Sequence, residues 1–155
     1  MTLPDESVPF TTLDGHPITL EAFLARYSQG QRKLFIGTDS KTVQHTKFST
    51  VLVSYSPGHG GVLLKRSRRE LKIASLQERL WKEAWYSVQL GLEITGRLRR
   101  AQIEIHLDVN CDERHRSGVY APALVGLVTS QGFAYRIKPE AWCATCIADR
   151  LVRNR

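Results

Sequence analysis

The sequence predicts an α/β fold, and three observations support this prediction. Apolar segments at residues 33–40, 47–56 and 62–66 are joined by short connections, which is typical of an antiparallel meander of three strands. A long amphipathic pattern at about residues 75–96 predicts a helix. Strand and helix patterns then alternate to the end of the chain. The predicted order is therefore three strands, a helix, a strand, a helix, a strand and a helix.

Residues 1–30 are predicted to be a lead-in, and residues 31–155 a single domain. Within the lead-in, Asp14-Gly15 is a turn signal. A short amphipathic helix follows, with Thr19 as its N-cap and Tyr27 near its end. We expect this helix to precede the sheet.

The strands and helices of the domain follow from their patterns. Leu34-Phe35-Ile36 are consecutive apolar residues, so both faces of this strand are predicted to be buried, as in a central strand. Residues 102–109 alternate between apolar and polar side chains, which predicts a fourth strand. A helix is predicted at about residues 119–131 and a fifth strand at 133–137. The last helix is predicted to begin at Lys138-Pro139-Glu140, because Pro is favoured at the first helical position.

Composition indicates a globular protein of the reducing cytoplasm. The chain has 155 residues, of which 42% are hydrophobic and 24% charged, and these values are ordinary for one domain. No apolar run is long enough to span a bilayer, and the first residues lack the pattern of a secretory signal. The three cysteines argue against a disulfide framework. We therefore expect a cytoplasmic protein that does not associate with membranes.

The charge distribution favours a polyanionic partner. The formal net charge is +7, and basic residues gather at 65–69, 97–100, 114–116 and 150–155. A surface that binds nucleic acid requires such clusters. The alternative is a set of solvated charges on different faces. Charge alone gives nucleic acid binding a modest advantage.

Four acidic residues are candidates for a functional site. Asp39 is predicted to lie where a central strand leaves the sheet, a position suited to a cation or a polar ligand, although it would also cap a turn. Asp108 ends the fourth strand in the same way. Glu83 flanks the apolar stripe of the long helix. Asp149 falls near the end of the last helix, where an acid opposes the helix dipole and requires either a basic partner or a metal.

Other residues with possible chemistry are weaker candidates. Cys143 and Cys146 have the CxxC spacing but lack a second ligand pair, so buried small residues are favoured over zinc or redox chemistry. His45, His106 and His115 are possible ligands or proton shuttles, but a lone histidine is more often a hydrogen-bonded structural residue.

The predicted order resembles the ribonuclease H-like fold, in which helices cover both faces of a five-stranded mixed sheet. Several sequence blocks are similar to the YkuK-type family of ribonuclease H-like proteins, whose biochemical role is largely uncharacterised. These blocks are Ile36-Gly-Thr-Asp-Ser-Lys41, His106-Leu-Asp-Val-Asn110, Gly132-Phe133, Lys138-Pro-Glu-Ala-Trp142 and Ile147-Ala-Asp-Arg150. The resemblance spans about residues 33–152.

This resemblance implies a divalent-metal-dependent nuclease that hydrolyses phosphodiester bonds in RNA or DNA. Its metal ions would be Mg²⁺ or Mn²⁺, with Asp39 as the bridging ligand, because hard cations prefer oxygen ligands. The implied catalytic and metal-binding residues are Asp39, Glu83, Asp108 and Asp149. The candidate phosphate contacts are Lys41, Arg68, Arg69 and Lys138.

Two other functions compete with the nuclease. One is a catalytically weak or inactive ribonuclease H-like protein that binds nucleic acid or acts as an adaptor. The other is a phosphatase at Gly37-Thr-Asp-Ser40, but Lys41 stands where such an enzyme needs a second Asp. If Glu83 points away from the other acids, Glu78 or His106 is the replacement.

Overall fold

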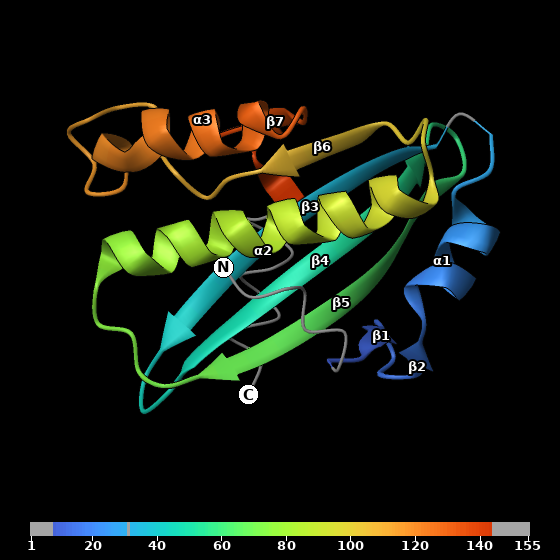
Figure 1. The fold of residues 1–155 in the computed structure, drawn as a ribbon, viewed down its shortest axis with the longest axis horizontal. Coiled ribbons are helices and arrows are strands. Elements are labelled where there is room, and N and C mark those ends of the chain that lie inside the picture. The colour runs from blue at the N-terminus through green and yellow to red at the C-terminus, as the bar shows by residue number, and fades with distance from the viewer. Residues whose placement is uncertain (1–7, 31, 144–155) are drawn as a thin grey trace.

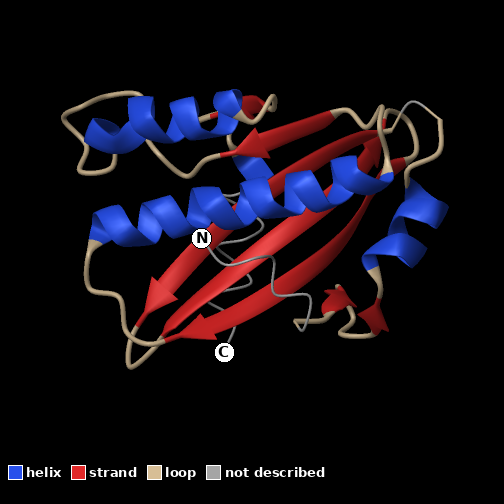
Figure 2. Ribbon diagram, viewed as in Figure 1, coloured by secondary structure: helices blue, strands red, loops and turns tan. Residues whose placement is uncertain are grey.

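The computed structural model describes residues 8–30 and 32–143, which form one mixed sheet with helices against it (Figure 1, Figure 2). Among these residues the sheet has seven strands in the order β2-β1-β5-β4-β3-β6-β7. The strands are β1 (Phe10–Thr12), β2 (Pro17–Ile18), β3 (Lys33–Thr42), β4 (Thr46–Ser56), β5 (Gly60–Glu70), β6 (Ile103–His106) and β7 (Ala134–Arg136). The helices are α1 (Leu20–Tyr27), α2 (Leu76–Arg97), the 3-10 turn η1 (Gly118–Tyr120) and α3 (Ala121–Ser130).

The α/β class and the five predicted strands are confirmed, but the strand number is wrong because the lead-in adds β1 and β2. These two strands have only three and two residues, too few for an alternating pattern to appear. β1 pairs with the outer edge of β5 at Thr11 with Lys65 and Thr12 with Leu64. Since this pairing joins segments far apart in the sequence, local patterns could not predict it.

β3 is the central strand, as its apolar run predicted. It pairs antiparallel with β4 along its whole length, from Lys33 to Thr42. On its other side it pairs in parallel with β6, but this pairing ends at Gly37 with His106. Asp39 therefore lies within β3 and not at its end, which corrects the prediction. It lies instead where the neighbouring strand has already stopped.

α2 lies along one face of the sheet (Figure 1). It begins after Ser75, whose hydroxyl accepts a hydrogen bond from the backbone N–H of Glu78 at 3.2 Å. The predicted apolar stripe is confirmed, because Leu80, Ala84 and Val88 are buried against the sheet. This packing fixes which side chains of α2 face β3.

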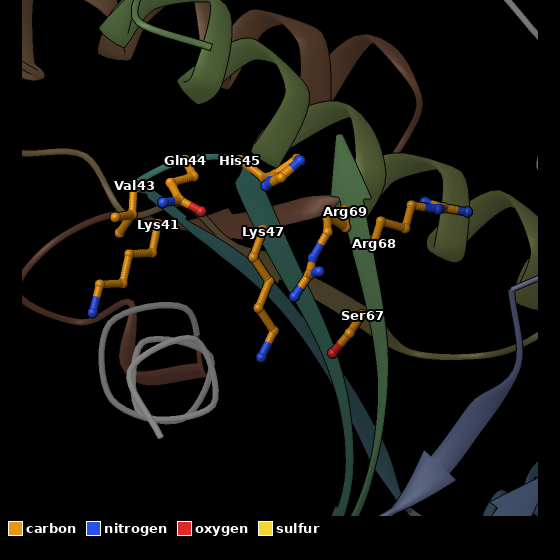
Figure 3. A pocket seen from close by; sticks show the side chains of 8 residues that line it. All are labelled: Lys41, Val43, Gln44, His45, Lys47, Ser67, Arg68 and Arg69. Carbon is orange, nitrogen blue, oxygen red and sulfur yellow. The ribbon is translucent and has the colours of Figure 1, made fainter. Parts of the chain in front are cut away.

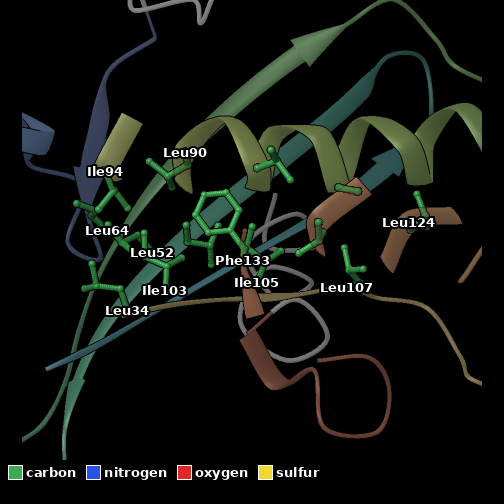
Figure 4. Close-up of a cluster of buried hydrophobic side chains, with 14 of the residues drawn as sticks. Leu34, Leu52, Leu64, Leu90, Ile94, Ile103, Ile105, Leu107, Leu124 and Phe133 are labelled. Atoms are coloured by element: carbon green, nitrogen blue, oxygen red, sulfur yellow. The ribbon is translucent and has the colours of Figure 1, made fainter. Parts of the chain in front are cut away.

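The main core fills the space between α2, α3 and this face of the sheet (Figure 4). The Phe133 ring packs so closely on α2 that a Cβ atom at Gly91 would lie 2.8 Å from its Cζ. α1 contributes Leu20, Phe23 and Leu24 to the same core. Its predicted cap is confirmed: the Thr19 hydroxyl accepts from the N–H of Ala22 at 3.1 Å. The division at residue 30 stays a prediction.

A smaller cluster covers the opposite face, where Phe35, Val51 and Val53 pack with Cys143. Residues 138–140 form a turn, closed by a hydrogen bond from the N–H of Glu140 to the carbonyl of Ile137 at 2.9 Å. The last helix therefore does not begin at Pro139, which corrects the prediction. Asp149 and Cys146 lie outside the described residues.

Candidate active site

Asp39 and Asp108 occupy corresponding positions on neighbouring segments. Gly37 of β3 pairs with His106 of β6, and each acid follows two residues after that pair. The Asp39 side chain is 8% exposed, whereas Asp108 is half-buried. Because β6 ends at His106, no strand among the described residues pairs with the flank of β3 beside Asp39. Asp108 lies two residues beyond the end of β6 and not at its last position, which corrects the prediction. The two acids thus border one gap in the sheet.

Glu83 extends from α2 toward the same part of β3. Its side chain is 7% exposed, and its Oε1 accepts a hydrogen bond from the Ser40 hydroxyl at 2.5 Å. Glu78 is exposed at the start of α2, so it is not needed as a replacement. Glu93 forms a two-point ion pair with Arg66, at 2.9 and 3.0 Å. Of the α2 acids, Glu83 alone is held against β3 by a hydrogen bond among the described residues.

The charges of Asp39 and Asp108 act on Glu83. Burial raises the pKa of the Glu83 carboxyl well above its ordinary value, and the neighbouring carboxylates of Asp39 and Asp108 raise it further. The hydrogen bond from Ser40 opposes this effect but does not outweigh it. A buried acid beside two other acids either keeps its proton or requires a nearby cation.

A lysine supplies part of the positive charge. The Lys138 ammonium lies 2.9 Å from Oδ1 of Asp108. Lys138 was predicted to contact phosphate, and in this structure it neutralises an acid of the site. Residues 8–30 and 32–143 contain no group of three His, Cys, Asp or Glu side chains arranged to hold a metal ion. The fourth predicted acid, Asp149, lies outside those residues.

The donor atoms nevertheless suit a hard cation. Ser49 lies directly opposite Asp39 on β4, is fully buried, and its hydroxyl oxygen has no hydrogen-bond partner among the described residues. Such an atom usually contacts water or a ligand. A cavity of about 10 Å³, lined in part by Glu83 and Asp108, has room for about one water-sized group. Carboxylate and hydroxyl oxygens fit Mg²⁺ or Mn²⁺ in chemistry, although three ligands are not yet assembled.

Both ring nitrogens of His106 take part in hydrogen bonds within the protein. This favours a structural role for His106 over a role as a metal ligand. Its Nε2 bonds to Glu104 at 2.8 Å, and its Nδ1 accepts the N–H of Cys143 at 3.1 Å. Burial lowers the pKa of the imidazole, although the Glu104 hydrogen bond opposes this. His45 and His115 are exposed in a turn and a loop. Burial also raises the pKa of the Cys143 thiol, which agrees with the prediction of a buried small residue.

Three of the four predicted phosphate contacts, Lys41, Arg68 and Arg69, line one hollow (Figure 3). Lys47, which the sequence did not single out, lines it as well. Arg68 points away from those side chains, and its guanidinium lies 4.5 Å from the ring centre of Tyr86 on α2. The importance of Lys47 and Ser49 could have been found only from the register of β3, β4 and β5.

Comparison with known proteins places the chain in a family. The family model for ribonuclease H-like proteins matches residues 18–153, so the chain belongs to the ribonuclease H-like family. Within it, the chain is similar to the uncharacterized protein YkuK of Bacillus subtilis (strain 168). The two are 28% identical over 151 residues, which cover 86% of this chain and 87% of YkuK. The YkuK-type resemblance is thereby confirmed, and no solved structure gave a significant match.

The part of the chain that the structure describes contains no helix long and apolar enough to cross a membrane. The cytoplasmic location stays a prediction.

Proposed function

We propose that this protein is a nuclease that hydrolyses phosphodiester bonds of RNA or DNA with Mg²⁺ or Mn²⁺. The observation that supports this most is the placement of three acids around the gap where β6 ends: Asp39 and Asp108 each follow the last β3–β6 pair by two residues, and Glu83 bonds to Ser40, the residue after Asp39. Membership of the ribonuclease H-like family agrees with it. A cluster of buried acids is costly to stability, and such clusters occur where chemistry requires them.

Each side chain has a part in the proposed reaction. Asp39, Glu83 and Asp108 would hold the cation, with Asp149 as a further ligand. When bound, the cation would lower the pKa of a water molecule and neutralise charge that develops on the phosphate. Ser40 orients the Glu83 carboxylate through its hydrogen bond. Lys138 would exchange its contact with Asp108 for a phosphate oxygen when substrate arrives.

The test is cleavage of labelled single-stranded RNA, single-stranded DNA and an RNA–DNA hybrid by the purified protein. We expect cleavage with Mg²⁺ or Mn²⁺ that EDTA abolishes. Asp39→Asn and Asp108→Asn should each lower the rate by at least about a hundredfold, because loss of a second-shell partner alone costs about 10- to 100-fold. Asp14→Asn, an exposed change of the same kind, should have no effect. Full activity in EDTA or in both site variants would contradict the proposal.

A protein that binds nucleic acid without cutting it is the second candidate. Two observations favour it: Lys138 already neutralises Asp108, and no three-ligand group is assembled among residues 8–30 and 32–143. This candidate predicts salt-sensitive binding with no turnover in Mg²⁺ or Mn²⁺. Cleavage of any of the three substrates that is lost in Asp39→Asn would exclude it.

A further inference from the structure

A second basic hollow lies at the opposite end of β3, where the end of α1, the start of β3 and the end of α2 meet. Its volume is about 540 Å³. No acidic residue is among the described residues that line it, whereas four arginines are: Arg32, Arg97, Arg99 and Arg100. The proposed reaction gives no role to the basic cluster at residues 97–100. We call this cavity the arginine hollow.

Two of these arginines are held in place by hydrogen bonds to the protein. Arg32 donates from Nε to the Ser54 hydroxyl at 2.7 Å and from Nη2 to the Ser54 carbonyl at 3.1 Å. Arg97 donates from Nη1 to the carbonyl of Glu93 at 3.0 Å, in the last turn of α2. A guanidinium has five N–H donors, so both side chains keep donors for an anion. Because their orientation is already fixed, binding an anion there costs less conformational entropy.

The other two arginines are exposed in the turn that follows α2. Neither Arg99 nor Arg100 forms an ion pair or a side-chain hydrogen bond with the part of the chain that the structure describes. The nearest acids in the sequence, Glu93 and Glu104, are engaged in ion pairs with other basic side chains. The arginine hollow therefore presents positive charge that the described protein does not neutralise.

The arginine hollow and the candidate active site lie at different points along β3 and α2. Along β3, the segment from Leu34, which lines the hollow, to Asp39 is about 17 Å long. Along α2, the segment from Glu83 to Arg97 is about 21 Å long. Phosphates on each strand of a duplex are spaced by about 3.4 Å along its axis, so these lengths correspond to about six base pairs. A duplex that lies along α2 would reach both places.

We propose that the arginine hollow binds the phosphate backbone of a nucleic acid duplex at a distance from the acids. This inference rests on the proposed function for the kind of ligand, but it concerns binding and not hydrolysis. Arginine suits this ligand, because a guanidinium donates paired hydrogen bonds to phosphate and stays charged at neutral pH. A duplex is stiff over about six base pairs, so contacts at the hollow would fix the direction in which it passes the acids.

The test compares two variants with equal loss of charge. The hollow variant carries Arg99→Gln and Arg100→Gln, and Arg32 and Arg97 are kept because they bond to the protein. The control variant carries Lys65→Gln and Lys72→Gln, on β5 and in the loop after it, away from the described lining of the hollow. Binding of a labelled RNA–DNA hybrid of about twelve base pairs, twice the estimated spacing, is followed by fluorescence anisotropy over a range of salt concentrations. EDTA is present throughout, so cleavage cannot consume the probe.

We expect the hollow variant to bind the hybrid at least about tenfold more weakly at low salt than the control variant. The slope of log affinity against log salt should become shallower by about 0.9 for each arginine removed, hence by about 2. The melting temperature should not change, since neither Arg99 nor Arg100 contacts a polar group of the described chain.

Equal weakening in both variants, unchanged binding in the hollow variant, or no binding by the unaltered protein would overturn the inference. A parallel titration with a fluorescent ATP analogue tests a free nucleotide as the source of the phosphate. If the hollow variant loses binding of the analogue but not of the hybrid, the hollow is a nucleotide site and the inference is wrong. Failure of the cleavage assay would leave the binding result intact, so the two proposals are tested separately.

Discussion

Among single residues, Glu83 combines a cost in stability with the proposed function. It is buried, it accepts a hydrogen bond from Ser40, and its pKa is raised by burial, by Asp39 and by Asp108. In the unfolded chain the same carboxyl loses its proton at its ordinary pKa of about 4.3. The folded state therefore becomes less favourable as the pH rises above that value toward the raised pKa.

Glu83→Gln should stabilise the protein at neutral pH and abolish its proposed activity. Gln keeps an oxygen that can accept the Ser40 hydrogen bond but carries no charge. The melting temperature should rise by several degrees, since about 1 kcal/mol corresponds to roughly 2–4 °C in a chain of this size. The gain should shrink toward about pH 4, where the wild-type carboxyl is protonated in both states. Thermal unfolding followed by circular dichroism measures this, with exposed Glu78→Gln as the control. A lower melting temperature for Glu83→Gln at neutral pH would contradict the electrostatic account.

His106 couples stability to pH with the opposite sign. Its pKa is lowered in the folded protein, mainly by burial, so the unfolded chain binds the proton more readily. Protonation of Nδ1 would also remove the acceptor for the N–H of Cys143. Stability should therefore fall as the pH drops below about 6.5, the ordinary pKa of histidine.

His106→Gln should remove most of this pH dependence between about pH 7.5 and 5.5. The variant should lose about 1–2 kcal/mol overall, because Gln replaces the two hydrogen bonds imperfectly. Urea unfolding at a series of pH values measures the slope, and exposed His45→Gln provides a matched control. If the slope persists in His106→Gln, another group is responsible for it.

At the scale of an element, α2 contains one glycine that is tightly packed and another that has open space beside it. Gly91 lies beneath the Phe133 ring, with no space for a side chain. Gly96, about one and a half turns later, has no atom within 4 Å of the place where a Cβ would lie. The same substitution should therefore have opposite effects at the two positions.

Gly91→Ala should destabilise the protein by about 1–3 kcal/mol through overpacking. Gly96→Ala should stabilise it by up to about 1 kcal/mol, because Ala has the higher helix propensity. Adding Phe133→Leu to Gly91→Ala should recover part of the loss if the ring is the obstacle. Chemical denaturation of the single and double variants provides the comparison. Equal effects of the two glycine substitutions would show that the contact with Phe133 does not limit the packing of α2.

At the scale of the whole molecule, the lead-in packs as part of the folded domain. Phe10 and α1 side chains belong to the main core, and the Phe10 ring centre lies 3.8 Å from the guanidinium carbon of Arg66. Arg66 is in turn the buried partner of Glu93. Phe10 therefore covers one member of a charged pair that water would otherwise reach.

A chain that begins at residue 31 should lose most of its stability. Removing Phe10, Leu20, Phe23 and Leu24 eliminates about 1.5–3 kcal/mol of apolar burial for each side chain. The sum is comparable to the whole stability of a typical domain. A chain that begins at residue 8 should retain a cooperative unfolding transition. Equal urea midpoints for these two chains would instead support the predicted boundary at residue 30.

How much the sequence predicts depends on the range of the interactions. The strand with Asp39 and the helix with Glu83 follow from local periodicity, which their long, regular patterns make clear. The pairing of β1 with β5 is too short and too distant in sequence to leave such a pattern. The contact of Lys138 with Asp108 and the placement of Lys47 depend on tertiary contacts and strand register, which composition and spacing do not specify.

Two hydrogen bonds join β3 to α2, and their spacing matches the rise per residue of both the strand and the helix. Thr38 bonds to Ser87 at 2.8 Å, and Ser40 bonds to Glu83. The interval is two residues in the strand, about 6.6 Å, and four residues in the helix, about 6 Å. Because these two lengths are nearly equal, both hydrogen bonds can form at the same time. A single inserted residue between Glu83 and Ser87 would turn one of them about 100° away. Relatives that retain this site should therefore conserve both intervals, even where the side chains themselves differ.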